Sequence, residues 1–428
     1  MKTIIDYLKS FPCDKNVFIN EIQSFTYKDI LDLYTNNKKT IDKISNYSIV
    51  INTSNRLEFA KLLSILDGNV KRIVFLPPDI NSSLLNNYYE DSKASFIAYL
   101  KNDILEITPI SKKIILENIT QTQWLIPTSG TTNNPKLITH TFNSLTQSTK
   151  KSNKVCSNYI WGLTFDIYRF SGLQVFLQAI LGGSSIIIPS DNNFIEMIKI
   201  FIKNHCNIIS ATPSFWRKVL MIKESKKLNL RRITLGGEIC DEQILISLKA
   251  TFPDCKITHI YASTEVGVGF SVTDEKSGFP LDYLKNGFNN SLIKVDENNI
   301  LWIKPNNSQE FINTGDIVKI ENDRVYFQGR ETGSINVGGN KVQPEEIESK
   351  LLTLDLIKEV YVYAKKNPIL GSLVCADIVI KDSDKTIEFI KEEIFSFCRK
   401  NLENFKIPAI LNIVESLELT SNGKKKRS

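Results

Sequence analysis

Residues 47–76, YSIVINTSNRLEFAKLLSILDGNVKRIVFL, contain two short apolar runs on either side of a longer stretch with helical spacing. The runs Tyr47–Ile51 and Arg72–Leu76 are rich in β-branched residues, which favour strands. Leu57–Leu66 repeats its apolar residues three and four positions apart, which predicts a helix. A strand, a helix and a second strand with short links predict a βαβ unit and therefore a parallel sheet.

The same alternation continues to about residue 261. Ile186–Ile188 and Ile208–Ile209 are apolar runs, and Phe194–Ile202 between them has helical spacing. Two more runs, Ile233–Leu235 and Ile257–Tyr261, complete the series. Repeated strand and helix patterns of this kind predict an α/β fold with parallel sheets.

The pattern changes towards the C-terminus. Three short strand-like runs predict a small β region: Trp302–Lys304, Asp316–Ile320 and Val325–Gln328. Beyond Arg330, a helical pattern that starts with Pro344 and acidic residues is followed by two alternating runs, Val360–Ala364 and Val374–Ile380, and by a second helical pattern from Ile387. We therefore expect a multi-domain α/β protein with a large N-terminal domain at 1–329 and a small, mobile α+β domain at 330–428.

Composition excludes several classes of protein. Of 428 residues, 42% are hydrophobic, too many for an intrinsically disordered chain. The 53 basic and 47 acidic residues give a net charge of +6, which predicts neither a nucleic-acid partner nor a membrane surface. We find no signal peptide and no apolar run long enough to span a bilayer, so we expect a cytoplasmic protein, a monomer or a homodimer. The sequence has only three histidines, which disfavours a histidine-rich metal site. None of its seven cysteines forms a C-x-x-C pair of the kind found in metal and redox sites.

The strongest chemical signal is Thr128–Lys136, TSGTTNNPK, directly after the apolar run Trp124–Ile126. Hydroxyl groups, backbone N–H groups and a lysine in so short a loop suit a polyphosphate. The alternative is an ordinary polar surface turn. The P-loop pattern G-x-x-x-x-G-K-[ST] is absent, so this loop is not the usual nucleotide-binding loop.

Four further motifs follow in order. Tyr261–Glu265, YASTE, places a hydroxyl beside a carboxylate at the end of a predicted strand, which suits Mg²⁺ and phosphate. Thr314–Asp316 puts a carboxylate after a turn glycine, Gly329-Arg330 precedes GGNKVQPEEIE, and Thr420–Arg427 ends the chain with four basic residues. Taken singly, each has an ordinary alternative: a solvated acid, a turn, or a basic tail.

Their order and their extent along the chain resemble the adenylate-forming superfamily, which includes acyl- and aryl-CoA synthetases, luciferases and the adenylation domains of peptide synthetases. Weaker matches add to the resemblance: Phe25–Ile30, Gly236–Glu238 and Phe405–Pro408. The resemblance implies that ATP and Mg²⁺ convert a carboxylate to an acyl-adenylate, with release of pyrophosphate. It also implies that the small domain rotates afterwards to admit a thiol.

The resemblance implies a role for each matching residue. The phosphate-binding residues would be Thr128, Ser129, Gly130, Thr131, Thr132 and Lys136. The adenine and ribose residues would be Gly236, Gly237, Glu238, Tyr261, Ala262, Ser263, Asp316 and Arg330. The catalytic residues would be Lys424, Thr264 at the α-phosphate, and Glu265, which would also bind the metal.

One segment is a candidate for binding the acid substrate. Arg169–Leu173, RFSGL, resembles the H-x-x-G-L segment of acyl- and aryl-CoA synthetases, with Gly172 as its glycine. Arg169 replaces the usual histidine or aromatic residue, and its guanidinium can pair with a substrate carboxylate. The alternative is a structural ion pair. Phe165-Asp166 also resembles the F-D pair of amino-acid-activating domains, in which the Asp binds an ammonium group, although the later spacing fits that branch less well.

We therefore predict an AMP-forming ligase that activates a small carboxylic acid and transfers it to a thiol. The expected cofactors are ATP, Mg²⁺ and coenzyme A. The alternative acceptor is the phosphopantetheine arm of a separate acyl carrier protein. A third hypothesis is a non-catalytic nucleotide-binding scaffold, which the retained Lys136, Glu265, Asp316 and Lys424 argue against.

Overall fold

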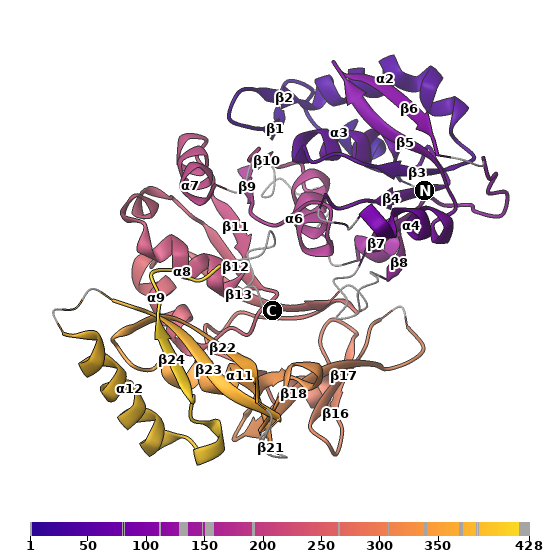
Figure 1. The fold of residues 1–428 in the computed structure, drawn as a ribbon. Coiled ribbons are helices and arrows are strands. Elements are labelled where there is room, and N and C mark those ends of the chain that lie inside the picture. The colour runs from indigo at the N-terminus through magenta and orange to yellow at the C-terminus, as the bar shows by residue number, and fades with distance from the viewer. Residues whose placement is uncertain are drawn as a thin grey trace. The chain divides into compact units, whose positions relative to one another are not determined.

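The computed structural model (Figure 1) describes residues 2–78, 80, 82–110, 113–127, 136–147, 149, 158–190, 193–263, 266–306, 308–337, 340–367, 371–381, 383 and 385–418. The chain divides into two compact units. The first consists of Met1–Ser210, Glu224–Ile233 and Ser263–Gly267, and the second of Ala211–Lys223, Thr234–Ala262 and Val268–Ser428. No helix in the described ranges is long and apolar enough to cross a membrane.

The first unit contains two sheets with parallel central strands. In the order β6-β5-β3-β4-β7-β8, the pairs β3–β4, β3–β5 and β4–β7 are parallel, and the outer strands β6 and β8 are antiparallel. These strands are β3 (Ser48–Ile51), β4 (Arg72–Phe75), β5 (Ala94–Lys101), β6 (Ile104–Pro109), β7 (Gln123–Pro127) and β8 (Leu137–Thr141). The other sheet includes β1 (Asn16–Ile19), β2 (Ser24–Thr26), β9 (Ile160–Leu163), β10 (Ser185–Ile187) and β11 (Ile208–Ala211).

The predicted βαβ unit is present in the first unit. All four residues of β3 are buried, as expected for a strand covered on both faces. Helix α3 (Arg56–Leu66) begins where the Asn55 side chain accepts hydrogen bonds from two backbone N–H groups of its first turn. The other helices of this unit are α1 (Ile4–Leu8), α2 (Tyr27–Lys43), α4 (Leu85–Asp91), α5 (Phe142–Leu145), α6 (Phe170–Leu181) and α7 (Phe194–Lys203).

A buried carboxylate, Asp67, lies between α3 and β4 and joins three parts of the first unit. It accepts hydrogen bonds from the backbone N–H of Ile4 at 2.9 Å and from the indole N–H of Trp124 at 3.0 Å. Only 1% of the residue is exposed. Burial raises the pKa of the Asp67 carboxyl to about 6, because desolvation disfavours the charged form.

We expect Asp67→Asn to change how stability depends on pH. The native carboxyl keeps its proton to a higher pH than the unfolded one, so wild type loses stability as pH rises from 3.8 to about 6. This shift corresponds to roughly 3 kcal/mol, at about 1.36 kcal/mol per pKa unit. The variant does not titrate there. The free energy of unfolding, measured across this pH interval, should therefore fall for wild type relative to the variant. Parallel pH profiles for the two proteins would contradict the raised pKa of Asp67.

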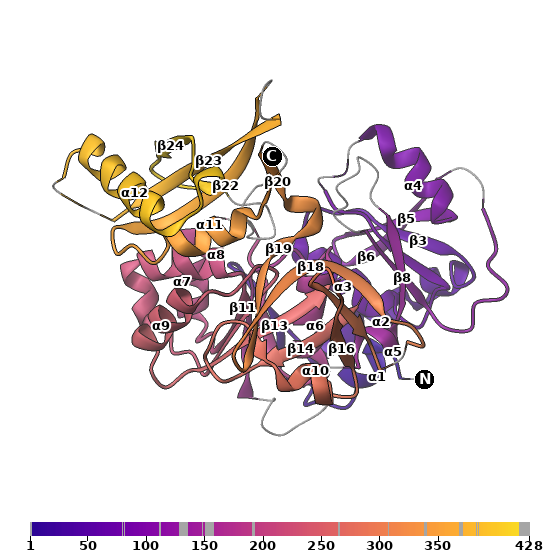
Figure 2. The same cartoon turned by 90° about the horizontal axis from the view of Figure 1, so that it is seen from below.

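The second unit begins with helix α8 (Pro213–Met221) and the neighbouring strands β12, β13 and β14, and continues into an antiparallel sheet ordered β15-β19-β18-β17-β16. In Figure 2, the hairpin of β18 and β19 passes beside β13 and β14. The bounds are β12 (Arg232–Gly236), β13 (Lys256–Ser263), β14 (Gly267–Val272), β15 (Phe279–Pro280), β16 (Leu292–Val295), β17 (Ile300–Lys304), β18 (Ile312–Glu321) and β19 (Arg324–Arg330), with helices α9 (Glu242–Thr251) and α10 (Asp282–Asn286).

The last part of the second unit is an α+β element with its own core. Strands β20 (Ile335–Val337), β21 (Asn340–Val342), β22 (Ile357–Asn367), β23 (Gly371–Ile380) and β24 (Ile410–Ile413) form one sheet. Helices α11 (Pro344–Leu351) and α12 (Ile387–Asn401) pack on it, and Figure 1 shows α12 along one face. The shared core includes Ile347, Val360 and Ile394, all fully buried. The predicted fold class is confirmed: mixed α/β, with a small β region and a smaller C-terminal element.

Candidate nucleotide and acid site

Tyr261 lies near the end of β13 in a cluster of aromatic rings within the second unit. Its ring centroid is 5.2 Å from that of Phe270 on β14 and 5.3 Å from that of Phe327 on β19, with nearly parallel planes in both pairs. Such offset contacts stabilise each ring pair by about 0.5–1.5 kcal/mol. Gly269 leaves room for the ring, since a Cβ there would lie 3.2 Å from Tyr261 Cδ1. The cluster therefore fixes the plane of Tyr261.

The Tyr261 hydroxyl group donates a hydrogen bond to the Asp316 carboxylate on β18. Burial, and then the charge of Asp316, raise the pKa of Tyr261 well above its usual value, so the phenol stays protonated. The other oxygen of Asp316 accepts from Nε of Arg330 at 3.0 Å, across the antiparallel pair β18–β19. The structure thus brings together Tyr261, Asp316 and Arg330, three residues that the sequence predicted on the adenine and ribose side.

The Thr-Gly-Asp turn places the Asp316 carboxylate. The Thr314 hydroxyl group donates to the Leu301 carbonyl at 2.7 Å and accepts from the Asp316 N–H at 3.1 Å. Gly315 has a φ of +69°, a conformation that glycine adopts without strain. The Arg330 guanidinium also donates to the Thr314 carbonyl at 3.0 Å, while 59% of its side chain remains exposed. The Arg330 end of this cluster is therefore exposed to solvent.

Gly236 ends β12, and Gly237 and Glu238 follow. Gly237 has a φ of +82°, which turns the chain out of the strand. The Glu238 carboxylate accepts a hydrogen bond from the Ser214 N–H at 2.9 Å, in the first turn of α8. A carboxylate is favoured there because helix N-termini carry unsatisfied N–H groups. Glu238 thus links the end of β12 to α8, and its contact with adenine stays a prediction.

Several predicted residues lie outside the described part of the chain: Thr128, Ser129, Gly130, Thr131, Thr132, Thr264, Glu265 and Lys424. Lys136 is exposed immediately before β8, Ala262 is exposed on β13, and the Ser263 hydroxyl group accepts from the Val266 N–H at 3.1 Å. Among the described residues, no group of three His, Cys, Asp or Glu side chains is arranged to hold a metal ion. The phosphate and magnesium roles stay predictions.

On the acid side, Asp166 lies in the first unit beside a cation that the sequence analysis did not predict. Its carboxylate is 2.6 Å from the Arg56 guanidinium, and the two side chains are only 10% and 4% exposed. Arg56 is the first residue of α3, so the pair joins α3 to the segment before α6. A sequence separation of 110 residues gives no local signal of this pair.

Gly172 and Arg169 lie at the start of α6. A Cβ on Gly172 would lie 2.2 Å from the Asp166 carbonyl oxygen, so only glycine permits this close approach. Arg169 precedes α6 as its N-cap residue, is partly buried, and makes no capping bond through its side chain. Its charge lies close enough to Tyr88 to oppose the rise in pKa that burial causes there. The structure therefore gathers Asp166, Arg169 and Gly172 around one helix start.

Two features missed in the sequence are Arg56, as the partner of Asp166, and the aromatic pair of Phe270 and Phe327. Phe327 stands two residues before Gly329-Arg330, and Phe270 lies on the strand after YASTE. A search for aromatic residues flanking the predicted motifs would have found both. No comparable signal existed for Arg56.

Comparison with known proteins gives the family of this α/β protein. The chain belongs to the AMP-binding enzyme family, whose profile matches residues 56–340. The profile of the AMP-binding enzyme C-terminal domain matches residues 346–424. The predicted adenylate-forming superfamily is thus confirmed, and with it an AMP-binding enzyme.

This chain aligns with three curated relatives, over a different share of each relative's length. The 2-succinylbenzoate–CoA ligase of Listeria innocua is 22% identical over 404 residues, covering 89% of this chain and 83% of the relative. Enterobactin synthase component E of Escherichia coli is 22% identical over 337 residues, covering 69% and 61%. The D-alanine–D-alanyl carrier protein ligase of Staphylococcus aureus is 26% identical over 355 residues, covering 71% and 69%.

Two solved structures share the fold over nearly the whole chain. A benzoate CoA ligase from Burkholderia xenovorans superposes with a TM-score of 0.78 at 16% identity, covering 100% of this chain and 99% of the other. The o-succinylbenzoate CoA synthetase of Bacillus subtilis, solved with ATP and magnesium ion, gives 0.70 at 18% identity, covering 99% and 98%. At these identities the likeness establishes the fold.

Proposed function

We propose that the protein is an ATP-dependent, AMP-forming acid–thiol ligase that joins a carboxylic acid to coenzyme A through an acyl-adenylate. Membership of the AMP-binding enzyme family supports the nucleotide chemistry, and the 2-succinylbenzoate–CoA ligase among the relatives supports the acceptor. The observation that carries the proposal is the contact of Tyr261 with Asp316 and of Asp316 with Arg330. It supplies an aromatic surface and a carboxylate–guanidinium pair for a nucleoside.

The Asp316 carboxylate keeps capacity for ribose. An ionised carboxylate has about four lone-pair sites, and the two described side-chain hydrogen bonds, from Tyr261 and Arg330, occupy two. Two vicinal ribose hydroxyl groups could donate hydrogen bonds to the two lone-pair sites that remain on Asp316. The exposed Arg330 guanidinium adds a donor for the ribose oxygens. We propose that the adenine is bound by Tyr261 together with Gly236, Gly237, Glu238, Ala262 and Ser263.

The remaining residues are proposed for the phosphates and the metal. Thr128, Ser129, Gly130, Thr131, Thr132 and Lys136 would bind the β- and γ-phosphates, and Thr264 the α-phosphate. Glu265 would hold Mg²⁺. That ion keeps several waters and is usually bound by one or two carboxylates together with substrate phosphates, so a single glutamate is a sufficient protein ligand. Bound Mg²⁺ would neutralise charge on the departing pyrophosphate.

Acid-dependent exchange of pyrophosphate into ATP tests the proposal. The assay should include aromatic, aliphatic, dicarboxylic and amino acids, because the sequence does not identify the acid. Exchange with one class, followed by thioester formation with coenzyme A, is the expected result. Exchange with none of the acids by a protein that still binds ATP would favour the non-catalytic nucleotide-binding scaffold.

A separate carrier protein is the second candidate acceptor. The D-alanine–D-alanyl carrier protein ligase among the relatives favours it, and so does the F-D pair at Phe165-Asp166. Against an amino acid substrate stands the Arg56–Asp166 ion pair, because Asp166 is already paired with a buried cation. Adenylated enzyme offered coenzyme A and a phosphopantetheinylated carrier protein in parallel distinguishes the two acceptors.

We expect Arg169→Ala to weaken binding of the acid far more than binding of ATP. If the guanidinium pairs with the substrate carboxylate, its loss costs about 2–5 kcal/mol. Exchange kinetics should then show a raised KM for the acid and an unchanged KM for ATP. Arg231→Ala, at an exposed arginine outside the site, is the control. A fall in thermal stability with an unchanged KM for the acid would make Arg169 structural.

The domain organisation, location and assembly state are proposed from the same reasoning. We place the boundary between the large and small domains at 329/330, and the two family profiles, at 56–340 and 346–424, support a division in this region. We expect a cytoplasmic protein that acts as a monomer or homodimer without nucleic-acid or membrane partners.

A further inference from the structure

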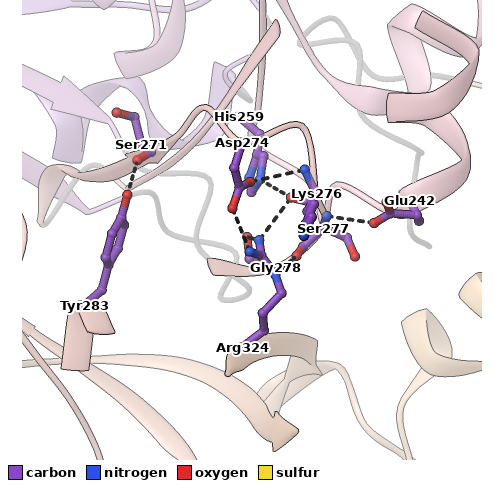
Figure 3. Close-up of polar contacts among 9 residues, drawn as sticks. All are labelled: Glu242, His259, Ser271, Asp274, Lys276, Ser277, Gly278, Tyr283 and Arg324. Atoms are coloured by element: carbon purple, nitrogen blue, oxygen red, sulfur yellow. Dashed lines mark hydrogen bonds and ion pairs between the residues drawn. The ribbon is translucent and has the colours of Figure 1, made fainter. Parts of the chain in front are cut away.

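Arg324, the first residue of β19, is buried by the loop that joins β14 to β15 (Figure 3). Its guanidinium donates to the Asp274 carboxylate at 2.7 Å and to the Ser277 carbonyl at 2.9 Å. It also donates to the carbonyls of Lys276 and Gly278, each at 3.2 Å. Only 8% of the residue is exposed. Charge-assisted bonds of this number, from one planar group, hold the loop firmly against β19.

The same loop is held from β13. The Nε2 atom of the His259 ring is 2.9 Å from the Lys276 carbonyl oxygen. Because a carbonyl only accepts, Nε2 carries the hydrogen. Burial lowers the pKa of His259, so the ring stays neutral. The Lys276 carbonyl therefore accepts one hydrogen bond from β13 and one from β19, which belong to different sheets.

The backbone of the loop between β14 and β15 packs closely against β19. Gly278 has a φ of +67°, and a Cβ there would lie 2.4 Å from the Val325 carbonyl oxygen of β19. The next residue, Phe279, pairs with Val325 in the antiparallel pair of β15 and β19. The Ser277 N–H donates to the Glu242 carboxylate of α9 at 2.9 Å. We call His259, Asp274, Lys276, Ser277, Gly278 and Arg324 the Arg324 clasp.

The clasp lies on the two strands that carry the Tyr261 cluster. His259 precedes Tyr261 by two residues, which places both side chains on one face of β13. Arg324 precedes Phe327 by three residues on β19 and Arg330 by six. The contacts of Tyr261 with Phe327 and Asp316 also join these two sheets. Contacts at the proposed nucleotide site and contacts at the clasp therefore both join the two sheets.

We propose that the Arg324 clasp is a positioning element for ATP, with Arg324 as its central residue. It fixes β13 against β19 and so sets the distance between the Tyr261 ring and the Asp316–Arg330 pair. A ligand held from both strands loses affinity when their spacing varies, because binding must then also order the strands. The inference rests on the proposed function, since it assumes that this cluster binds ATP.

Two variants test the clasp from different sides. Arg324→Lys keeps the charge but cannot reproduce the planar set of donors to the loop carbonyls. Gly278→Ala keeps every side chain of the clasp but pushes the loop away from β19. Lys319→Ala is the control, since Lys319 lies on β18 in an exposed pair with Glu321 and outside the clasp. Binding of ATP at equilibrium and both KM values in the exchange assay are measured well below each variant's Tm.

Both clasp variants should bind ATP roughly three- to tenfold more weakly, which lies within the range of couplings between residues of one contact network, with an unchanged KM for the acid. The control should match wild type. Combining Arg324→Lys with Tyr261→Phe should then weaken ATP binding less than the product of the single effects. A lowered Tm with wild-type ATP affinity in both variants would overturn the inference. Wild type that neither binds ATP nor exchanges pyrophosphate would instead refute the proposed function.

Discussion

Lys424→Ala will form acyl-adenylate roughly 10²–10³-fold more slowly than wild type, the loss that removing one transition-state donor causes. The physical reason is charge: a carboxylate and a triphosphate are both anions, and an ammonium group lowers the cost of bringing them together. Transfer from the adenylate to the thiol needs no such approach. The variant should therefore still convert supplied acyl-adenylate to thioester. Pyrophosphate exchange measures the first step, and thioester formation from synthetic adenylate measures the second.

The neighbouring lysines are the controls for this prediction. Lys425 and Lys426 share the basic run with Lys424, so a shift in register would transfer the role to one of them. Lys425→Ala and Lys426→Ala should each retain near-wild-type exchange. If Lys425→Ala loses exchange while Lys424→Ala keeps it, the register of the C-terminal motif is wrong.

Asp166→Ala will destabilise the first unit by about 3–5 kcal/mol, because it leaves the Arg56 guanidinium buried without its carboxylate. The cost comes from desolvation of the remaining charge. Arg56→Met should be destabilising for the same reason, since it leaves a buried carboxylate. The double variant Arg56→Met with Asp166→Leu removes both charges and should lose less than the sum of the two single losses. Denaturant unfolding provides these comparisons.

The exposed pair Lys28–Asp32 is the matched control. Its side chains are 67% and 52% exposed, and it lies on one helix. Asp32→Ala should change stability by less than about 1 kcal/mol, as is usual for surface ion pairs. Equal losses for Asp166→Ala and Asp32→Ala, or strictly additive losses in the double variant, would show that the Arg56–Asp166 pair is not coupled.

The fold was predictable from local signals. The runs around Tyr47–Leu76 alternate strand and helix spacing, and the structure has β3, α3 and β4 there. Such patterns depend on residues a few positions apart, which is the range that a sequence displays directly. The short strands of the small β region and the α+β pattern after Arg330 were predictable for the same reason.

Residues of the candidate site could be predicted only where they lie in short motifs. Asp316 and Arg330 follow turn glycines, and Tyr261 heads YASTE, so each was found without knowledge of its neighbours. The partner of Asp166 and the contacts of Arg324 were not, because they join segments 110 and 46–50 residues apart. In the sequence, Arg56 and Arg324 look like ordinary charged residues, and only packing shows that they are buried.

The hairpin of β18 and β19 has a consequence for the order in which the site assembles during folding. Asp316 and Arg330 are 14 residues apart, whereas Tyr261 and Asp316 are 55 apart. Closing the longer loop costs about 1 kcal/mol more in chain entropy than closing the shorter one. We therefore expect the charged half of the cluster to form first, as a local unit. The aromatic half should join it only when the two sheets dock.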